Sequence, residues 1–139
     1  MNTDWMNTDW KLLAAGSLLA FAAPLFAHHS FAAEYDGAKT IELKGTVTKV
    51  DWMNPHIWFY IDVKDASGQT VHWQCEGGAP NALSRQGWTR HSLKEGDQVD
   101  VQGALAKDGT NTCSARGVTL ADGKRVFAGS AEDPAAPKQ

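Results

Sequence analysis

The sequence has few of the features that point directly to a reaction. Its 139 residues include only two cysteines, too few for the paired Cys-x-x-Cys motifs of many zinc sites. It contains no glycine-rich phosphate loop and no Ser-His-Asp spacing, so these catalytic signatures are absent. Lys and Arg form no cluster or stripe, and the formal net charge is −3. Composition therefore argues against a nucleic acid or an anionic membrane surface as a partner.

Long hydrophobic runs are also scarce, and the one that is present predicts export. Residues 12–27 form an apolar run of 16, whereas a membrane-spanning helix needs about 20 such residues. Lys11 precedes the run and Ala27 ends it, an arrangement typical of a cleaved secretory signal peptide. We therefore expect residues 1–27 to be removed and the mature protein to be periplasmic or secreted, with no membrane attachment after cleavage.

Cleavage after Ala27 would leave a histidine pair, His28 and His29, at the new N-terminus. An α-amine has a reference pKa of about 8, so copper or nickel can displace its proton at neutral pH. The amine and imidazole of His28 close a chelate ring, and a nitrogen from His56 would complete a T-shaped histidine brace. Alternatively, His29 completes the site through the intervening amide and its own ring. The sequence thus predicts a metal site at His28, His29 and His56, with copper as the ion.

Two other interpretations of the N-terminus stay open. Cleavage after Phe26 would place His29 third in the chain, as in the amino-terminal copper and nickel motif, although signal peptidases disfavour Phe at that position. The histidines can also belong to a polar N-terminus that binds no metal in the cell. The start is open as well, because the first five residues, from Met1, repeat from Met6.

Alternation of apolar and polar residues dominates the mature chain and predicts strands. The apolar phase of the first strand slips by one residue between Val47 and Val50, and a bulge would absorb this slip. Pro80 suits the first turn of a helix and Gly87 would end it, so residues 80–86 are expected to form a short helix. The expected strands are 41–52, 57–63, 69–76, 99–105 and 113–120, with a last hairpin at 126–127.

Five strands with a short helix between the third and the fourth predict a mainly β fold, an OB-fold-like, five-stranded Greek-key barrel. The 112 residues from 28 to 139 suffice for one domain with a modest core. We expect a signal peptide over 1–27, a single OB-like barrel domain over 28–130 and a disordered tail over 131–139.

Both cysteines, Cys75 and Cys113, belong to the exported part of the chain. In an oxidising compartment such a pair favours one disulfide. The bond would close a loop of about 38 residues, worth roughly 3–4 kcal/mol if it is unstrained. The third and fifth strands are neighbours in the expected barrel, which agrees with this pairing. The alternative is a thiolate metal ligand.

One face of the second strand carries His56, Trp58 and Tyr60 at alternate positions, so all three point to one side. His72 and Glu76 extend this face on the third strand. OB-folds bind ligands across these two strands, so Trp58, Tyr60, His72 and Glu76 are candidate ligand-binding residues. Alternatively, the N-terminal segment covers the face, with Phe31 and Tyr35 packing over Trp58 and Tyr60. That cover would bring the N-terminal histidines toward His56.

Four segments together resemble an uncharacterised family of small exported bacterial proteins, classed as a domain of unknown function. The segments are Ala27-His28-His29-Ser30-Phe31, Trp52 to Trp58, Pro80 to Trp88, and Val118 to Gly123. The resemblance implies a single periplasmic or secreted domain and brings no established activity with it. The two cysteines are not part of the family's pattern. Because the pattern includes both the histidine pair and the Asn-Pro-His loop, the resemblance suggests that they share a site.

These observations favour a periplasmic metal-binding protein, with copper as the cofactor, that serves storage, delivery or resistance. The expected partners are the metal ion and another periplasmic protein. A metal-free OB-fold module for a small ligand or a protein partner is the first alternative. A histidine-brace copper oxidoreductase is the second, although a chain of this length leaves little beyond the barrel to hold a substrate. No catalytic residue is assigned.

Overall fold

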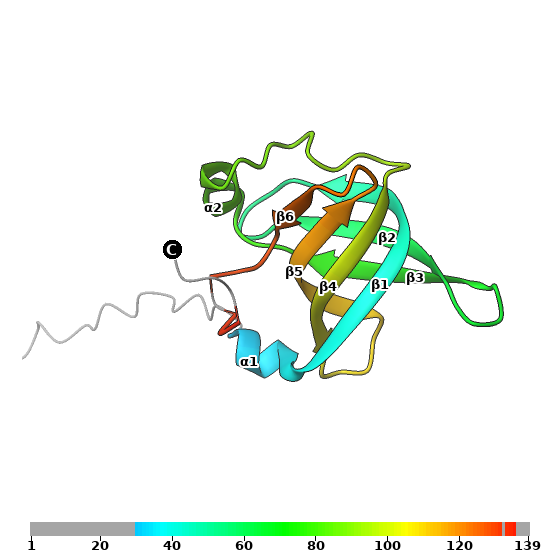
Figure 1. Cartoon of the computed structure of the whole chain (residues 1–139). Coiled ribbons are helices and arrows are strands. Elements are labelled where there is room, and N and C mark those ends of the chain that lie inside the picture. Colours follow the sequence, from blue (N-terminus) through cyan, green and yellow to red (C-terminus); the bar gives the residue numbers. More distant parts are fainter. Residues whose placement is uncertain (1–29, 132, 136–139) are drawn as a thin grey trace, which may run out of the picture.

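Strands make up most of the chain in the computed structural model, which describes residues 30–131 and 133–135. The predicted signal peptide and the pair His28 and His29 lie outside the described residues. In chain order the elements are α1 (Phe31–Glu34), β1 (Tyr35–Asp51), β2 (Trp58–Lys64), β3 (Thr70–Glu76), α2 (Pro80–Arg85), β4 (Gln98–Ala106), β5 (Thr112–Leu120) and β6 (Arg125–Phe127) (Figure 1).

All six described strands belong to one sheet, in the order β3-β2-β1-β4-β5-β6. Neighbours in this order are antiparallel. β3 and β5 pair as well, in parallel, through Gln74 to Glu76 on β3 and Thr112 to Ser114 on β5. Strands β1 to β5 therefore pair in a closed order (Figure 1). The mainly β class and the short helix between β3 and β4 are confirmed, and β6 is a sixth strand beyond the five expected.

Two irregularities of register fall where the hydrophobic pattern slips. β1 shifts against β2 between Val47 and Lys49, as the change of phase in the sequence predicts. A second shift separates the β4–β5 pair Gln102 and Gly117 from the pair Gly103 and Ala115. An extra residue in one strand bends it and increases its twist, so these shifts help the long strands to curve.

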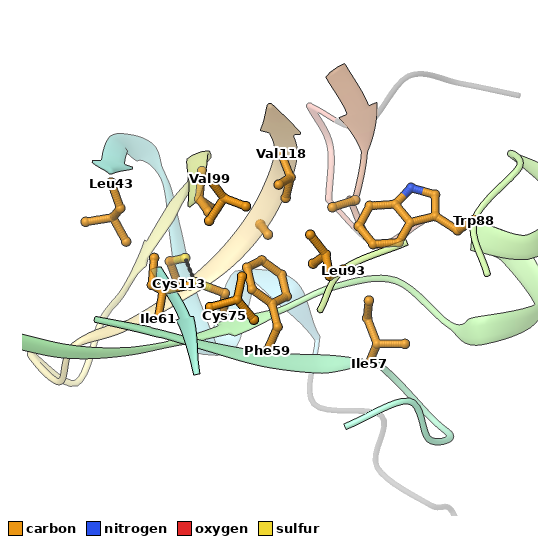
Figure 2. Close-up of a cluster of buried hydrophobic side chains, with 14 of the residues drawn as sticks. Leu43, Ile57, Phe59, Ile61, Cys75, Trp88, Leu93, Val99, Cys113 and Val118 are labelled. Atoms are coloured by element: carbon orange, nitrogen blue, oxygen red, sulfur yellow. Dashed lines mark hydrogen bonds between the residues drawn. The ribbon is translucent and has the colours of Figure 1, made fainter. Parts of the chain in front are cut away.

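The core lies between the inward faces of the strands and is closed by α2 and the loop that follows it (Figure 2). Trp88 and Leu93 come from that loop and are 4% and 3% exposed. Alternate residues of β2 point into this core, and the intervening ones do not. The fully buried large side chains are Val47, Ile57, Phe59, Ile61, Cys75, Leu83, Val101, Cys113 and Val118. A second, smaller cluster consists of Phe31, Tyr35, Ala104 and Ala106.

Helix α2 begins and ends as its sequence predicts. Pro80 occupies the first turn, where a missing N–H costs nothing. Gly87 follows the helix with a φ of +90°, the left-handed conformation that favours glycine. The backbone N–H of Trp88 then donates to the carbonyl of Leu83 over 3.0 Å, which turns the chain back to the core.

Among the described residues, no helix has both the length and the apolar character that a membrane span requires.

The loop before β2 is fastened to the segment that follows β3. The N–H of Ile57 donates to the Gly78 carbonyl over 3.1 Å, and the N–H of Gly77 donates to the Ile57 carbonyl over 2.9 Å. A Cβ atom at Gly77 would lie 2.6 Å from Cγ1 of Ile57, so this close approach requires glycine. The contact holds His56, the neighbour of Ile57, beside Glu76, the neighbour of Gly77.

The C-terminal segment differs from the expected disordered tail at Asp133. This residue is 3% exposed, and its carboxylate accepts hydrogen bonds from the Arg116 guanidinium over 2.7 and 3.2 Å. Arg116 also donates to the Thr40 hydroxyl and to the Gly37 carbonyl, and it lies 6.0 Å from the ring centroid of Phe31. The segment therefore packs beside α1 and the start of β1 (Figure 1). Composition does not predict this packing, because the segment is held by one ion pair, Arg116 with Asp133, and not by an apolar run.

We expect Asp133→Ala to lower the free energy of unfolding by about 3–5 kcal/mol, because it leaves a largely buried guanidinium without its carboxylate. The matched control is Asp100→Ala, which removes the partner of Lys44 in an exposed ion pair of 2.7 Å and should cost at most about 1 kcal/mol. Urea unfolding followed by tryptophan fluorescence measures both changes. Equal losses in the two variants would contradict the structural role of Asp133.

Candidate functional site

Three polar side chains from distant parts of the sequence meet at one end of β3. Glu76 is the last residue of β3, Tyr35 is the first residue of β1, and His56 lies in the loop between β1 and β2. His56 Nδ1 contacts Glu76 Oε1, and the Tyr35 hydroxyl donates to Glu76 Oε2 over 2.5 Å. We call this set the His56–Glu76–Tyr35 triad. The side chains of His56 and Glu76 are 20% and 13% exposed, so the triad is shielded but reachable.

The carboxylate at the centre of the triad defines its protonation. A carboxylate without a proton only accepts hydrogen bonds, so Glu76 accepts one from the Tyr35 hydroxyl and one from Nδ1–H of His56. The proton of a neutral His56 ring is thereby assigned to Nδ1. Burial, followed by the hydrogen bond to Glu76 and the charge of that carboxylate, raises the pKa of Tyr35 well above its usual range. Tyr35 thus stays a donor across the physiological range.

A small polar pocket adjoins the triad. Its volume is about 10 Å³, close to the space that one water molecule requires. Helix α1 contributes to its wall, and α1 begins immediately after Ser30. The triad therefore lies next to α1, the first helix among the described residues. The residues that line the pocket are Phe31, Glu34, Tyr35, His56, Glu76, Ser114 and Ser130.

The candidate ligand-binding residues on the outer face divide among separate hollows. Tyr60 and His72 line a hollow of about 510 Å³, whereas Trp58 lines another of about 580 Å³. Glu76 belongs to the triad. The His72 side chain is 83% exposed, and its Nδ1 lies 2.5 Å from Oδ1 of Asp62. The structure thus joins His56 with Glu76 and does not gather the four ligand-binding candidates in one place.

The N-terminal segment covers less of this face than the sequence suggests. The rings of Phe31 and Tyr35 pack against each other with centroids 5.5 Å apart. Tyr35 and Trp58 line the same hollow, but Tyr60 is capped by Lys49, whose Nζ lies 5.2 Å from the ring centroid. Within the described residues, Tyr35 therefore shares a hollow with Trp58, and the group over the Tyr60 ring is Lys49.

The described residues do not by themselves form a metal centre. Within 30–131 and 133–135, no group of three His, Cys, Asp or Glu side chains is placed to hold an ion. The triad offers an imidazole and a carboxylate, and the two other predicted ligands, His28 and His29, lie outside the described residues. A metal site here would need donors from that N-terminal pair.

Cys75 and Cys113 face each other in the parallel pairing of β3 and β5. Their sulfur atoms are 3.1 Å apart, both residues are fully buried, and both are thiols here (Figure 2). The hydrogen bond between the thiols, followed by burial, raises the pKa of Cys75. A raised pKa suppresses the reactive thiolate, so the folded dithiol is protected from reagents. The disulfide stays a prediction that this juxtaposition supports.

The fold and the triad define the class as a small, mainly β protein with a shielded histidine–carboxylate pair. The chain belongs to a family of unknown function, DUF6152, whose pattern matches residues 15–115. This confirms the resemblance to an uncharacterised family. No curated protein matches the sequence significantly.

Two solved structures share part of the topology at low identity. One is the mitochondrial single-stranded DNA-binding protein Rim1 of S. cerevisiae, with a TM-score of 0.47 and 12% identity over 60% of this chain and 93% of that one. The other is a ZRD-deleted mutant of TiaS in complex with agmatine, with a TM-score of 0.42 and 21% identity over 75% of this chain and 25% of that one. Similarities this weak carry no conclusion about the ligand of this chain.

Sequence reasoning placed His56 and Glu76 in different candidate sites and did not anticipate their contact. The contact depends on the register that pairs Trp58 with Glu76, because His56 precedes Trp58 by two residues. Tyr35 was expected as an apolar cover, and its hydroxyl was overlooked. The available signal was the outward alternation of β3, which assigns Glu76 to the face of His56.

The raised pKa of Tyr35 predicts that this phenol ionises only when the protein unfolds. Because the unfolded state releases the proton at about pH 10 and the folded state retains it, stability should fall as the pH rises above about 10. Absorbance of the phenolate near 295 nm, measured before and after unfolding, tests this. The chain has only two tyrosines, so Tyr60→Phe should keep the late-ionising group and Tyr35→Phe should remove it. A late-ionising group in Tyr35→Phe would contradict the assignment.

We predict that protein recovered from an oxidising compartment contains the Cys75–Cys113 disulfide. Its mass should be lower by two hydrogen atoms, and no thiol should react with an alkylating reagent after denaturation without reductant. Cys113→Ser is the control, because it leaves Cys75 as one thiol that must react under the same conditions. Two reactive thiols in the wild-type protein would overturn the disulfide.

Proposed function

We propose that the chain is an exported protein, periplasmic or secreted, that binds copper through His28, His29 and His56. The signal peptide would be residues 1–27, and the mature protein would start with the histidine pair. Storage, delivery or resistance are the roles that suit such a site, with a second periplasmic protein as donor or acceptor of the ion. The His56–Glu76–Tyr35 triad, the position of α1 and the chemistry of nitrogen ligands support this proposal.

The proposal includes the finer description of the fold. An OB-fold-like Greek-key barrel over residues 28–130 accounts for the closed pairing order of β1 to β5 and for α2 between β3 and β4. In this fold the sheet closes on itself. His56 lies in the loop that leads into β2 of this sheet, where it would add a ligand to those supplied by the chain terminus.

The contact between His56 Nδ1 and the Glu76 carboxylate is the observation that carries the proposal. Metal-binding histidines commonly donate their second ring N–H to a carboxylate, which fixes the tautomer and increases the basicity of the ligating nitrogen. Here the metal would bind Nε2 of His56. The 20% exposure of the His56 side chain leaves the ring accessible from the protein surface.

The predicted mature N-terminus starts close enough to reach this ring. Phe31 and His56 line the same small pocket, and three residue steps separate Phe31 from His28. An extended chain covers about 3.3–3.6 Å per residue, so the reach from Phe31 to the α-amine is roughly 10 Å. This length supports a site that combines the terminal amine and imidazole with His56.

The donor set favours copper over harder ions. An amine and imidazoles are nitrogen donors, which suit Cu(II) and Ni(II) in square-planar or tetragonal geometry. Copper forms the most stable complexes in the divalent series. Carboxylate-rich sites, which suit magnesium or calcium, are a poorer description of these residues.

A second candidate function is a binding module that uses the hollow lined by Tyr60 and His72. Its volume of about 510 Å³ falls in the range of small-molecule sites. Three of its lining side chains already have partners, because His72 contacts Asp62 and Lys49 contacts Asp51 outside the hollow, so an uncharged ligand would suit it. Tryptophan fluorescence that responds to such ligands and ignores copper would favour this function.

We expect Cu(II) titration of protein with a verified His28 start to give one tight, nitrogen-rich site by electron paramagnetic resonance. His56→Ala should weaken binding at least about tenfold, since even partners of metal ligands contribute this much. His72→Ala is the matched control: it removes another histidine bonded to a carboxylate, from an exposed position, and should leave the affinity unchanged.

A second test targets the terminal amine. Acetylating the α-amine of His28 removes one arm of the chelate ring, so copper affinity should fall sharply while the fold persists. Unchanged affinity in both the acetylated protein and His56→Ala would exclude the proposed site.

A further inference from the structure

We infer that Tyr35 and Glu76 are positioning residues of the proposed copper site, where the Tyr35 hydroxyl holds Glu76 in the orientation that fixes the tautomer of His56. The inference rests on the proposed function for its role in metal binding. The proton arrangement itself can be measured without metal. Neither residue would touch the ion through the geometry described here, so both would act through His56.

The position of the Tyr35 hydroxyl is determined from two sides. The backbone of Tyr35 pairs with Ala106 at the start of the β1–β4 ladder. The ring is 4% exposed and packs on Phe31. A phenol fixed by both backbone pairing and ring packing has one direction in which to donate, and that direction leads to Glu76 Oε2.

The Glu76 carboxylate, like the Tyr35 hydroxyl that donates to it, is held by backbone pairing and by side-chain contacts. Glu76 pairs with Trp58 of β2 and with Ser114 of β5, so its backbone is flanked by a strand on each side. Its two oxygens then bond to two different residues, Tyr35 and His56. A group fixed at the backbone and at both oxygens can impose an orientation on an imidazole ring that sits in a loop.

The test is a cycle of Tyr35→Phe, Glu76→Gln and the double variant, with Tyr60→Phe as the matched control. Glu76→Gln should weaken Cu(II) binding at neutral pH by about 10–100-fold. Tyr35→Phe should weaken it by up to about tenfold. If Tyr35 acts through Glu76, the double variant should bind no more weakly than Glu76→Gln alone.

A metal-free readout separates this inference from the proposed function. The ¹⁵N chemical shifts of the His56 ring report which nitrogen carries the proton, and we expect the Nδ1–H form in the wild type. Tyr35→Phe should change these shifts and Tyr60→Phe should not. If the wild-type protein shows this response but binds no copper, the positioning role stands and the copper function fails.

The opposite results overturn the positioning role. Copper binding and ¹⁵N shifts that are the same in Tyr35→Phe and Tyr60→Phe would show that the Tyr35 hydroxyl is only structural. Additive losses in the double variant would show that Tyr35 does not act through Glu76. Should Tyr35→Phe not fold, Glu76→Gln carries the test alone, and unchanged ¹⁵N shifts and copper affinity in it would reject the inference.

Discussion

The short parallel pairing of β3 with β5 is the constraint on which the rest of the structure depends. It joins only three residues on each strand, yet it closes the pairing order of the first five strands. The same three positions place Cys75 opposite Cys113 in the core and Glu76, a member of the triad, beside the buried Ser114. Core closure and site geometry therefore arise from one contact between segments that are far apart in the sequence.

The elements of the fold were largely predictable, because each depends on local pattern. Alternation of apolar residues identified the strands, a slip of that alternation identified the shift near Val47, and Pro80 with Gly87 delimited α2. The triad was not predictable in the same way, since it needs the register of β2 on β3 and the path of the chain before β1. The sequence predicted His56 as a functional residue and left its partner unassigned. Asp133 escaped notice because a single buried carboxylate leaves no periodic signal.

Membership of DUF6152 confirms the family and leaves the activity to be argued from the site. The triad supports one chemical inference, which concerns the orientation of the His56 ring. The Glu76 carboxylate contacts the His56 ring and accepts a hydrogen bond from the Tyr35 phenol, beside helix α1. The proposed function would link two predicted events, cleavage before His28 and capture of an ion, through His56.

The pair of Arg116 and Asp133 has a consequence for the order in which the protein is completed. Arg116 bonds to Gly37 and Thr40 near the beginning of the folded chain and to Asp133 near its end. Synthesis must therefore reach Asp133 before the region around α1 gains its final support. A protease that cut the chain between Arg116 and Asp133 would take away the carboxylate partner of a guanidinium that also contacts Gly37, Thr40 and Phe31, and the start of β1 would loosen.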